Sequence, residues 1–145
     1  ILITEFAMEQ VRKHSRKRDA ILRCVRSTDC HPTAEWVFSR LKPEIPDLSL
    51  GTVYRNLAMF KEEGTILSLG VVHGLERFDR RVDPHCHLAC QRCSRVLDVE
   101  ELDLPETLCQ QAAEITGGTV TSWNLLFLGL CDTCKQKTEA KQENK

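Results

Sequence analysis

The chain has 145 residues, enough for one domain or two small ones, and 41% of them are hydrophobic, which suffices for a packed core. No apolar run approaches the ~20 residues needed to span a membrane, and the apolar start at residues 1–3 lacks the basic leader and cleavage site of a secretory signal. We therefore expect a cytoplasmic protein with no membrane partner.

The charges are distributed unevenly along the chain. Residues 1–81 carry 14 Lys and Arg against 11 Asp and Glu, whereas residues 82–145 carry 6 Lys and Arg against 10 Asp and Glu. This asymmetry predicts two units with different partners.

Three helices are predicted in the front half. They begin after Ser15, Thr33 and Ser49, because each of these side chains can cap a helix and hydrophobic residues follow at helical spacing. The third helix covers residues 50–62 and ends before Gly64. Two strand-like runs, 66–72 and 75–79, follow and are joined by His73-Gly74, which predicts a hairpin.

This order of elements predicts a winged helix-turn-helix, with helix 50–62 as the recognition helix and the hairpin as the wing. The face assigned to DNA carries side chains that can reach phosphates or base edges: Thr52, Tyr54, Arg55 and Asn56. Arg18 is a further DNA-binding candidate, since seven basic residues lie between positions 12 and 26. The alternative is an ordinary amphipathic surface helix.

The back half is predicted to begin after a hinge at residues 80–84. A short strand at 96–99 and a helix from Pro105 to Thr116, capped by Asp103 or Leu104, precede a long strand at 119–130. That strand is apolar on both faces and needs cover on both, which indicates a dimer interface. A small self-sufficient core is the alternative. Residues 135–145 are polar and are predicted to be disordered.

The strongest chemical signal is a pair of Cys-x-x-Cys motifs, Cys90/Cys93 and Cys131/Cys134. Four thiolates in two such pairs suit the tetrahedral coordination of a structural zinc ion. A redox dithiol or simple buried cysteines are the alternatives.

A second signal comes from His and Asp residues near the hinge. His85 and His87 lie on one side of a predicted strand, because side chains alternate along it. His31, Asp79 and Asp98 could join them, and such imidazole and carboxylate ligands suit Fe(II), Mn(II) or Zn(II). Each also has a simpler interpretation: His31 as a turn residue, Asp79 as the end of a strand, and Asp98 as a surface charge.

Several motifs in the chain resemble those of the ferric uptake regulator family, from about Ser15 to Cys134. In order they are His31-Pro32-Thr33-Ala34-Glu35, Gly51-Thr52-Val53-Tyr54-Arg55-Asn56-Leu57, Arg77-Phe78-Asp79, His85-Cys86-His87 and both Cys-x-x-Cys pairs. The resemblance implies a homodimer, an N-terminal winged helix and a C-terminal α/β dimerisation domain.

The resemblance also implies how the metal is used. The three-His, two-Asp regulatory site of the family's peroxide-sensing branch corresponds to His31, Asp79, His85, His87 and Asp98, and its oxidised residues to His31 and His85. Iron-sensing members usually have Glu in place of Asp98. The family's additional metal site is expected to be absent, because Pro84, Cys86 and Trp123 replace its ligands. The usual Thr-Pro before the second helix is Ser15-Arg16 here, which affects expected DNA contacts.

Together these features predict an α+β protein: a winged-helix DNA-binding domain (1–79), a hinge (80–84), a dimerisation and metal-binding domain (85–134) and a tail (135–145). The expected function is that of a repressor, not an enzyme. It would hold structural Zn(II) and regulatory Fe(II) or Mn(II), bind a pseudo-palindromic double-stranded operator, and respond to peroxide through iron-catalysed oxidation of its ligand histidines. Iron, manganese or zinc sensing are alternatives within the family. A zinc enzyme or a thiol oxidoreductase is the alternative outside it, but His31 and Glu35 have the wrong spacing for a cytidine-deaminase-like site.

Overall fold

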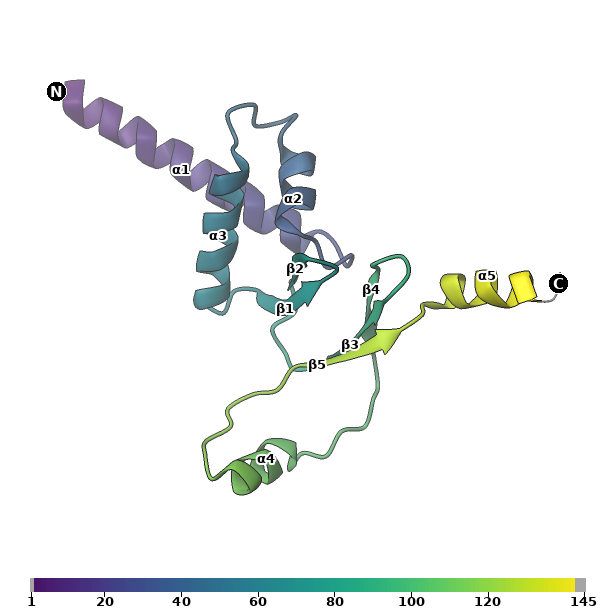
Figure 1. Ribbon diagram of the computed structural model, residues 1–145. Helices are drawn as coiled ribbons and strands as arrows, with labels where there is room; N and C mark the ends of the chain where they lie inside the picture. The colour runs from purple at the N-terminus through teal and green to yellow at the C-terminus, as the bar shows by residue number, and fades with distance from the viewer. Residues whose placement is uncertain (1, 143–145) are drawn as a thin grey trace. The chain divides into compact units, whose positions relative to one another are not determined.

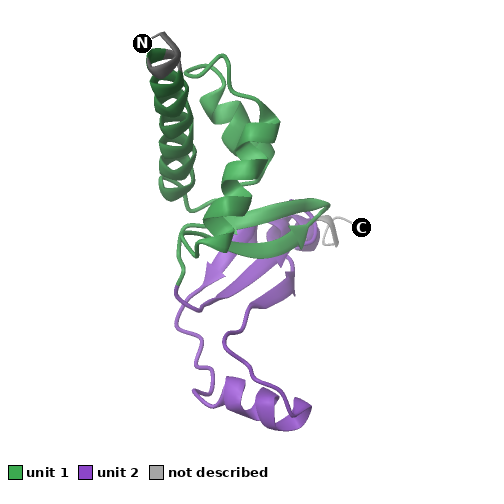
Figure 2. Cartoon of the chain, turned by 90° about the vertical axis from the view of Figure 1, so that its left-hand side faces the viewer, with its two compact units in different colours: residues 1–82 green, residues 83–145 purple. Residues whose placement is uncertain are grey.

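The computed structural model describes residues 2–142 and divides the chain into two compact units, Ile1–Val82 and Asp83–Lys145 (Figure 2). The boundary between the units falls inside the segment predicted as a hinge. Within the described residues no helix is both long and apolar enough to cross a membrane.

The first unit contains three helices followed by a two-stranded wing (Figure 1). The helices are α1 (Leu2–Arg26), α2 (Ala34–Leu41) and α3 (Leu50–Glu62), and the strands are β1 (Leu67–Val72) and β2 (Leu75–Asp79). The wing is antiparallel and pairs Leu67 with Asp79 and Val72 with Leu75. Its turn residues, His73 and Gly74, both have positive φ, as a tight two-residue hairpin requires. This is the predicted winged helix.

Local capping explains where α2 and α3 begin. The Thr33 hydroxyl accepts the backbone N–H of Trp36, and the Ser49 hydroxyl accepts that of Thr52, both at 3.1 Å. Each cap satisfies one of the unpaired N–H groups at a helix N-terminus. Both predicted caps are therefore confirmed.

The first helix differs from the prediction, because α1 starts at Leu2 and runs through Ser15 without interruption. The stretch before Ser15 has no proline or glycine, and an i,i+4 ion pair between Glu9 and Lys13 (3.1 Å) supports it. A serine inside a helix is only mildly unfavourable, so a good capping residue does not by itself end the helix.

The core of the first unit lies where the three helices and the wing meet. The fully buried side chains that the helices contribute are Ile21, Val25, Val37, Val53, Leu57 and Phe60. Ile66 and Phe78 join them from the wing and the segment before it. Burial of these side chains supplies the main driving force for folding this unit.

The second unit contains a three-stranded sheet with strand order β4-β3-β5. Strand β3 (Cys86–Cys90) runs antiparallel to β4 (Val96–Val99) and parallel to β5 (Leu125–Gly129). Between β4 and β5 the chain forms α4 (Leu108–Thr116), which ends at Gly117 in the left-handed conformation. No residue of α4 is buried in the single chain.

Two predicted elements of this unit have the wrong bounds, the helix α4 and the strand β5. Helix α4 begins at Leu108, after Thr107, rather than at Pro105 with a cap at Asp103 or Leu104. The predicted strand 119–130 is reduced to β5, because only Leu125–Gly129 find pairing partners on the five-residue strand β3.

The predicted disordered tail is instead largely helical, since α5 covers Asp132–Gln142. Its composition favours a helix, and two i,i+4 contacts support it, Gln136 with Asp132 at 3.0 Å and Lys135 with Glu139 at 3.9 Å. The last three positions of the predicted tail, 143–145, lie outside the described residues.

Candidate metal centres and nucleic-acid interface

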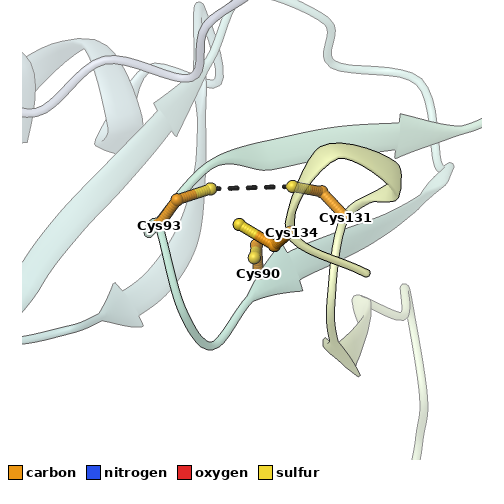
Figure 3. A group of neighbouring side chains, drawn as sticks. All are labelled: Cys90, Cys93, Cys131 and Cys134. Carbon is orange, nitrogen blue, oxygen red and sulfur yellow. Dashed lines mark hydrogen bonds between the residues drawn. The ribbon is translucent and has the colours of Figure 1, made fainter. Parts of the chain in front are cut away.

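Four cysteine side chains gather where β3 ends and α5 begins (Figure 3). Cys90 is the last residue of β3, Cys93 lies in the following turn, Cys131 precedes α5, and Cys134 lies in its first turn. Their sulfur atoms all lie within 4.8 Å of one another, and Cys93 and Cys131 are 3.7 Å apart. Parallel pairing of β3 with β5 brings the two motifs together, and the Gln91 N–H donates to the Gly129 carbonyl at 2.7 Å.

The geometry of this cluster fits a tetrahedral metal ion. A tetrahedron with metal–sulfur distances of about 2.3 Å has edges of roughly 3.8 Å, close to the observed 3.7 Å. All four cysteines are free thiols, so no disulfide competes for them. The sulfur donor set favours zinc over harder cations.

The thiols of the cluster also differ in acidity. Backbone N–H groups of Cys131 and Cys93 lower the pKa of Cys90 to about 5. Burial, together with hydrogen bonds that the Cys134 thiol donates to the neighbouring sulfur atoms, raises the pKa of Cys134 to about 12. A cluster of this kind stabilises a thiolate without a metal, and binding of a divalent cation would release the remaining protons.

The first unit contributes a buried His–Asp pair. His31 Nε2 lies 3.5 Å from Asp79 Oδ2, and the two side chains are only 3% and 4% exposed. His31 has a positive φ of 52°, which is uncommon for a residue with a side chain. The Arg77 guanidinium donates to the His31 carbonyl at 3.1 Å, and the Phe78 N–H donates to the Pro32 carbonyl at 3.0 Å. Strand β2 therefore holds the turn that presents His31.

The second unit contributes two imidazoles and a carboxylate. His87 on β3 is the register partner of Asp98 on β4, and His85 lies just before β3. The Nε2 atoms of His85 and His87 lie 3.4 and 3.3 Å from Asp98 Oδ1. Cys86 lies between the two histidines in sequence, and the side chain of Cys86 is buried.

The tautomer of His85 makes this group suitable for a cation. Its Nδ1 lies 2.8 Å from the Asp83 carbonyl, which can only accept, so Nδ1 carries the hydrogen. In the neutral ring Nε2 then directs a lone pair toward the Asp98 carboxylate. A cation between the Nε2 lone pair and the carboxylate would remove the repulsion between them. In histidine–metal sites the other ring nitrogen commonly donates to a carbonyl in this way.

The predicted DNA-binding residues on α3 fall into two groups. Thr52, Tyr54 and Arg55 are at least partly accessible, and Arg55 Nη2 donates to Thr52 Oγ1 at 3.2 Å. Asn56 is only 3% exposed, and its amide nitrogen donates to the Thr52 carbonyl at 2.8 Å. This contact within α3 is an alternative to the predicted contact of Asn56 with DNA, which stays a prediction. Positions 53, 56, 57 and 60 form the i, i+3, i+4, i+7 stripe that faces the core.

Arg18 also makes contacts within the first unit. Its guanidinium lies 4.8 Å above the centre of the Phe60 ring and donates to both carboxylate oxygens of Glu63, at 3.1 and 2.8 Å. These contacts join α1 to the end of α3. They indicate that Arg18 stabilises the packing of the helices, which is an alternative to its predicted contact with DNA.

Glu35, beside the predicted DNA-binding residues of α3, has a contact that sequence reasoning did not reveal. The Tyr54 hydroxyl on α3 donates to the carboxylate of Glu35 on α2. Glu35 belongs to a motif that carries the family resemblance, yet its contact joins positions far apart in the chain. No local pattern indicates this contact.

The fold and the ligand groups define a metal-binding protein with a winged-helix domain. Comparison with known proteins makes this more specific, since the sequence profile described as Ferric uptake regulator family matches residues 9–127. The chain belongs to the ferric uptake regulator family.

Individual relatives and structures agree with this assignment. The peroxide-responsive repressor PerR of Staphylococcus epidermidis is 33% identical over 121 residues, which cover 83% of this chain and 80% of that protein. The ferric uptake regulator of Francisella tularensis with iron has a TM-score of 0.66 and 26% identity, and the match covers 81% of this chain and 90% of that one. The Campylobacter jejuni peroxide stress regulator shares the fold, with a TM-score of 0.72, 22% identity, and coverage of 92% and 99%.

Proposed function

We propose that this protein is a metal-dependent, DNA-binding transcription repressor that responds to peroxide. Its similarity to the peroxide-responsive repressor PerR of Staphylococcus epidermidis supports the response to peroxide. The observation that carries the proposal is the combination of a winged helix with two kinds of ligand group, one of four thiols and one of imidazoles and carboxylates. A regulator of this kind acts on chromosomal DNA, and therefore in the cytoplasm.

The thiol cluster is proposed to hold a structural zinc ion on Cys90, Cys93, Cys131 and Cys134. Its support is the spacing of the four sulfur atoms and the burial of Cys90, Cys131 and Cys134. A closed site with four protein ligands leaves no position for a substrate, which favours a structural role over a catalytic one.

The imidazole and carboxylate groups are proposed to share one regulatory Fe(II) or Mn(II) ion. His31 and Asp79 would contribute from the first unit, and His85, His87 and Asp98 from the second. One ion held by both units would favour a single interdomain angle, and so couple metal occupancy to DNA binding.

The repressor is proposed to act as a homodimer on a pseudo-palindromic, double-stranded operator. Its support is the apolar surface of the second unit, where Ile115 on α4 is 85% exposed and Leu128 on β5 is 65% exposed. Such surface on a small unit favours association. A melting temperature that rises with protein concentration, and a sedimenting mass of two chains, would support the dimer.

Peroxide sensing is proposed to proceed through the ligand histidines. Fe(II) held by these residues would supply the electrons that reduce peroxide, whereas Mn(II) would resist this oxidation. His31 and His85 are expected to gain one oxygen atom, and an oxidised imidazole no longer binds as before. The two units would then lose their shared anchor, and the repressor would leave DNA.

The test loads purified protein with Fe(II) or Mn(II), adds low peroxide and maps peptides by mass spectrometry. One added oxygen on the peptides that contain His31 or His85, only in the iron form, supports the proposal. Intact histidines with DNA binding still controlled by iron would identify an iron sensor. First oxidation at Cys86 would identify a thiol switch.

A matched pair of variants tests the ligand assignment. Asp98→Ala should abolish metal-dependent DNA binding, because Asp98 lies against both His85 and His87. Asp103→Ala is the control, since it removes an exposed carboxylate outside the ligand group.

The enzyme alternatives make different predictions. A zinc-dependent turnover of substrate would favour a zinc enzyme, and disulfide exchange by the cysteine pairs would favour a thiol oxidoreductase.

A further inference from the structure

Tyr54 occupies an unusual position for an exposed aromatic residue. It lies on the outer face of α3 with 44% of its surface exposed, yet its hydroxyl is bonded to a neighbouring helix. The acceptor is the carboxylate of Glu35, in the first turn of α2. An exposed tyrosine without such a bond would be free to move between rotamers.

Glu35 is itself held in place. It lies two residues after the N-cap residue Thr33, in the first turn of α2. The Tyr54 hydroxyl is the main reason that the pKa of Glu35 lies below its ordinary value, and the same bond raises the pKa of Tyr54. The helix N-terminus further favours the ionised carboxylate. The acceptor is therefore charged and fixed at neutral pH.

We propose that Glu35 is a positioning residue for DNA recognition, which fixes the direction of the Tyr54 ring and occupies the only proton that its hydroxyl can donate. The proposal rests on the proposed function, because it assigns α3 to the major groove. Glu35 acts through Tyr54 and needs no contact with DNA of its own.

The bond determines what Tyr54 can recognise. A phenol has one O–H donor, and in this structure Glu35 accepts it. The hydroxyl can then only accept, so it cannot donate to a phosphate oxygen, to guanine N7 or O6, or to thymine O4. It can still accept from the amino groups of adenine and cytosine in the major groove. Glu35 thus makes Tyr54 selective between base edges and prevents a sequence-independent phosphate contact.

The carboxylate has a second, opposing effect. A negative charge near the DNA surface weakens binding to every sequence. Loss of Glu35 should therefore strengthen non-specific binding and weaken the preference for the operator. A purely electrostatic role would change both affinities by the same factor, so the ratio of the two separates the explanations.

The chain allows a clean spectroscopic test, because Tyr54 is its only tyrosine. Protein labelled with carbon-13 at the tyrosine ring carbon that bears the hydroxyl gives one NMR resonance. In the wild-type protein it should titrate at higher pH than in Glu35→Ala. Glu35→Gln should stay closer to the wild type in ring mobility, since the amide oxygen can still accept the hydroxyl. An identical resonance and titration in all three proteins would overturn the contact.

The DNA test uses a duplex selected from a random pool by the Mn(II)-loaded wild-type protein, and an unrelated duplex of equal length. Glu35→Ala should lower the ratio of the two affinities roughly five-fold, as expected for one lost hydrogen bond. Tyr54→Phe should lower it similarly, and Glu35→Ala should add nothing in the Tyr54→Phe background. Glu62→Gln, which removes an exposed charge on α3, controls for electrostatics.

The outcomes separate the two levels of the proposal. A wild-type protein that selects no duplex overturns the repressor function and this inference with it. Selection followed by an unchanged ratio in Glu35→Ala overturns only the role of Glu35. A ratio that falls by the same factor in Glu62→Gln also overturns it, because charge alone would then explain the effect.

Discussion

The two units of this protein are built around different kinds of interior. The first unit buries aliphatic and aromatic side chains from three helices and a wing. In the second, Cys90, Cys131 and Cys134 form a buried cluster against which Leu97 packs. A unit of this size with little apolar interior has too little hydrophobic stabilisation to fold firmly alone.

This difference indicates two sources of stability. The first unit depends on burial of apolar surface, which any folded copy provides. The second depends on what its thiols bind and on what covers α4, none of whose residues is buried. Small domains commonly compensate for a missing core with a metal or a partner chain. A mutation in one unit should therefore lower the stability of that unit and leave the other largely unchanged.

Loss of the thiol cluster should have the largest effect. Cys134→Ser removes one of the four ligands and should release the zinc, whose binding contributes on the order of 10 kcal/mol in small zinc domains. We expect the second unit to lose its cooperative transition in calorimetry, while the helical signal of the first persists. Cys109→Ser is the control, since Cys109 lies outside the cluster. Full zinc content and an unchanged Tm in Cys134→Ser would refute the assignment.

A cavity in the first unit should give the converse result. Phe60 is fully buried among the helices, and Phe60→Ala should cost about 3–5 kcal/mol. The first unit should melt earlier, whereas zinc content should not change. Val71→Ala, at an exposed position of the wing, should be close to neutral. Loss of zinc from Phe60→Ala would mean that the units fold as one.

Arg18 distinguishes a stabilising role from a DNA contact. Arg18→Ala removes a partly exposed ion pair with Glu63, worth about 0.2–1 kcal/mol, and the packing of its guanidinium on Phe60. We expect a slightly lower Tm and an unchanged salt dependence of DNA binding. Arg55→Ala should instead leave Tm nearly unchanged and cost roughly 1–3 kcal/mol in operator binding if Arg55 contacts a base. A reduced salt slope in Arg18→Ala would instead identify Arg18 as a phosphate contact, as the sequence predicts.

The smallest effect concerns pH and the wing. Although burial raises the pKa of Glu76, hydrogen bonds from Ser68 and Lys61 outweigh it, and the pKa lies below its ordinary value of 4.5. A carboxyl with a lowered folded pKa stabilises the protein above its unfolded pKa, and this is lost as the pH falls through the folded value. Glu76→Gln should therefore lower the Tm of the first unit at pH 7 by a small amount. The difference from wild type should disappear in acid, and a difference that grows there would contradict this account.

The sequence predicted α2, α3 and the wing because their signals are local: a capping side chain, a helical stripe and a two-residue turn. Boundaries that depend on distant partners were missed. The extent of β5 is set by the length of β3, which the run 119–130 does not encode. The burial of Asn56 was not predicted, because its side chain is polar although its position lies in the buried stripe. The contact of Glu35 was not predicted, because its partner lies on another helix.

The parallel pairing of β3 with β5 also bears on the order in which the chain folds. Cys86 pairs with Leu125, so the ends of a long segment must meet before the sheet exists, whereas the contacts of β1 with β2 are nearly adjacent in sequence. Non-local closure slows folding, because its entropic cost is met before the contacts form. We expect the first unit to refold first. Trp36 and Trp123, one in each unit, are the only two tryptophans, and stopped-flow fluorescence of single-tryptophan variants would follow the two halves separately.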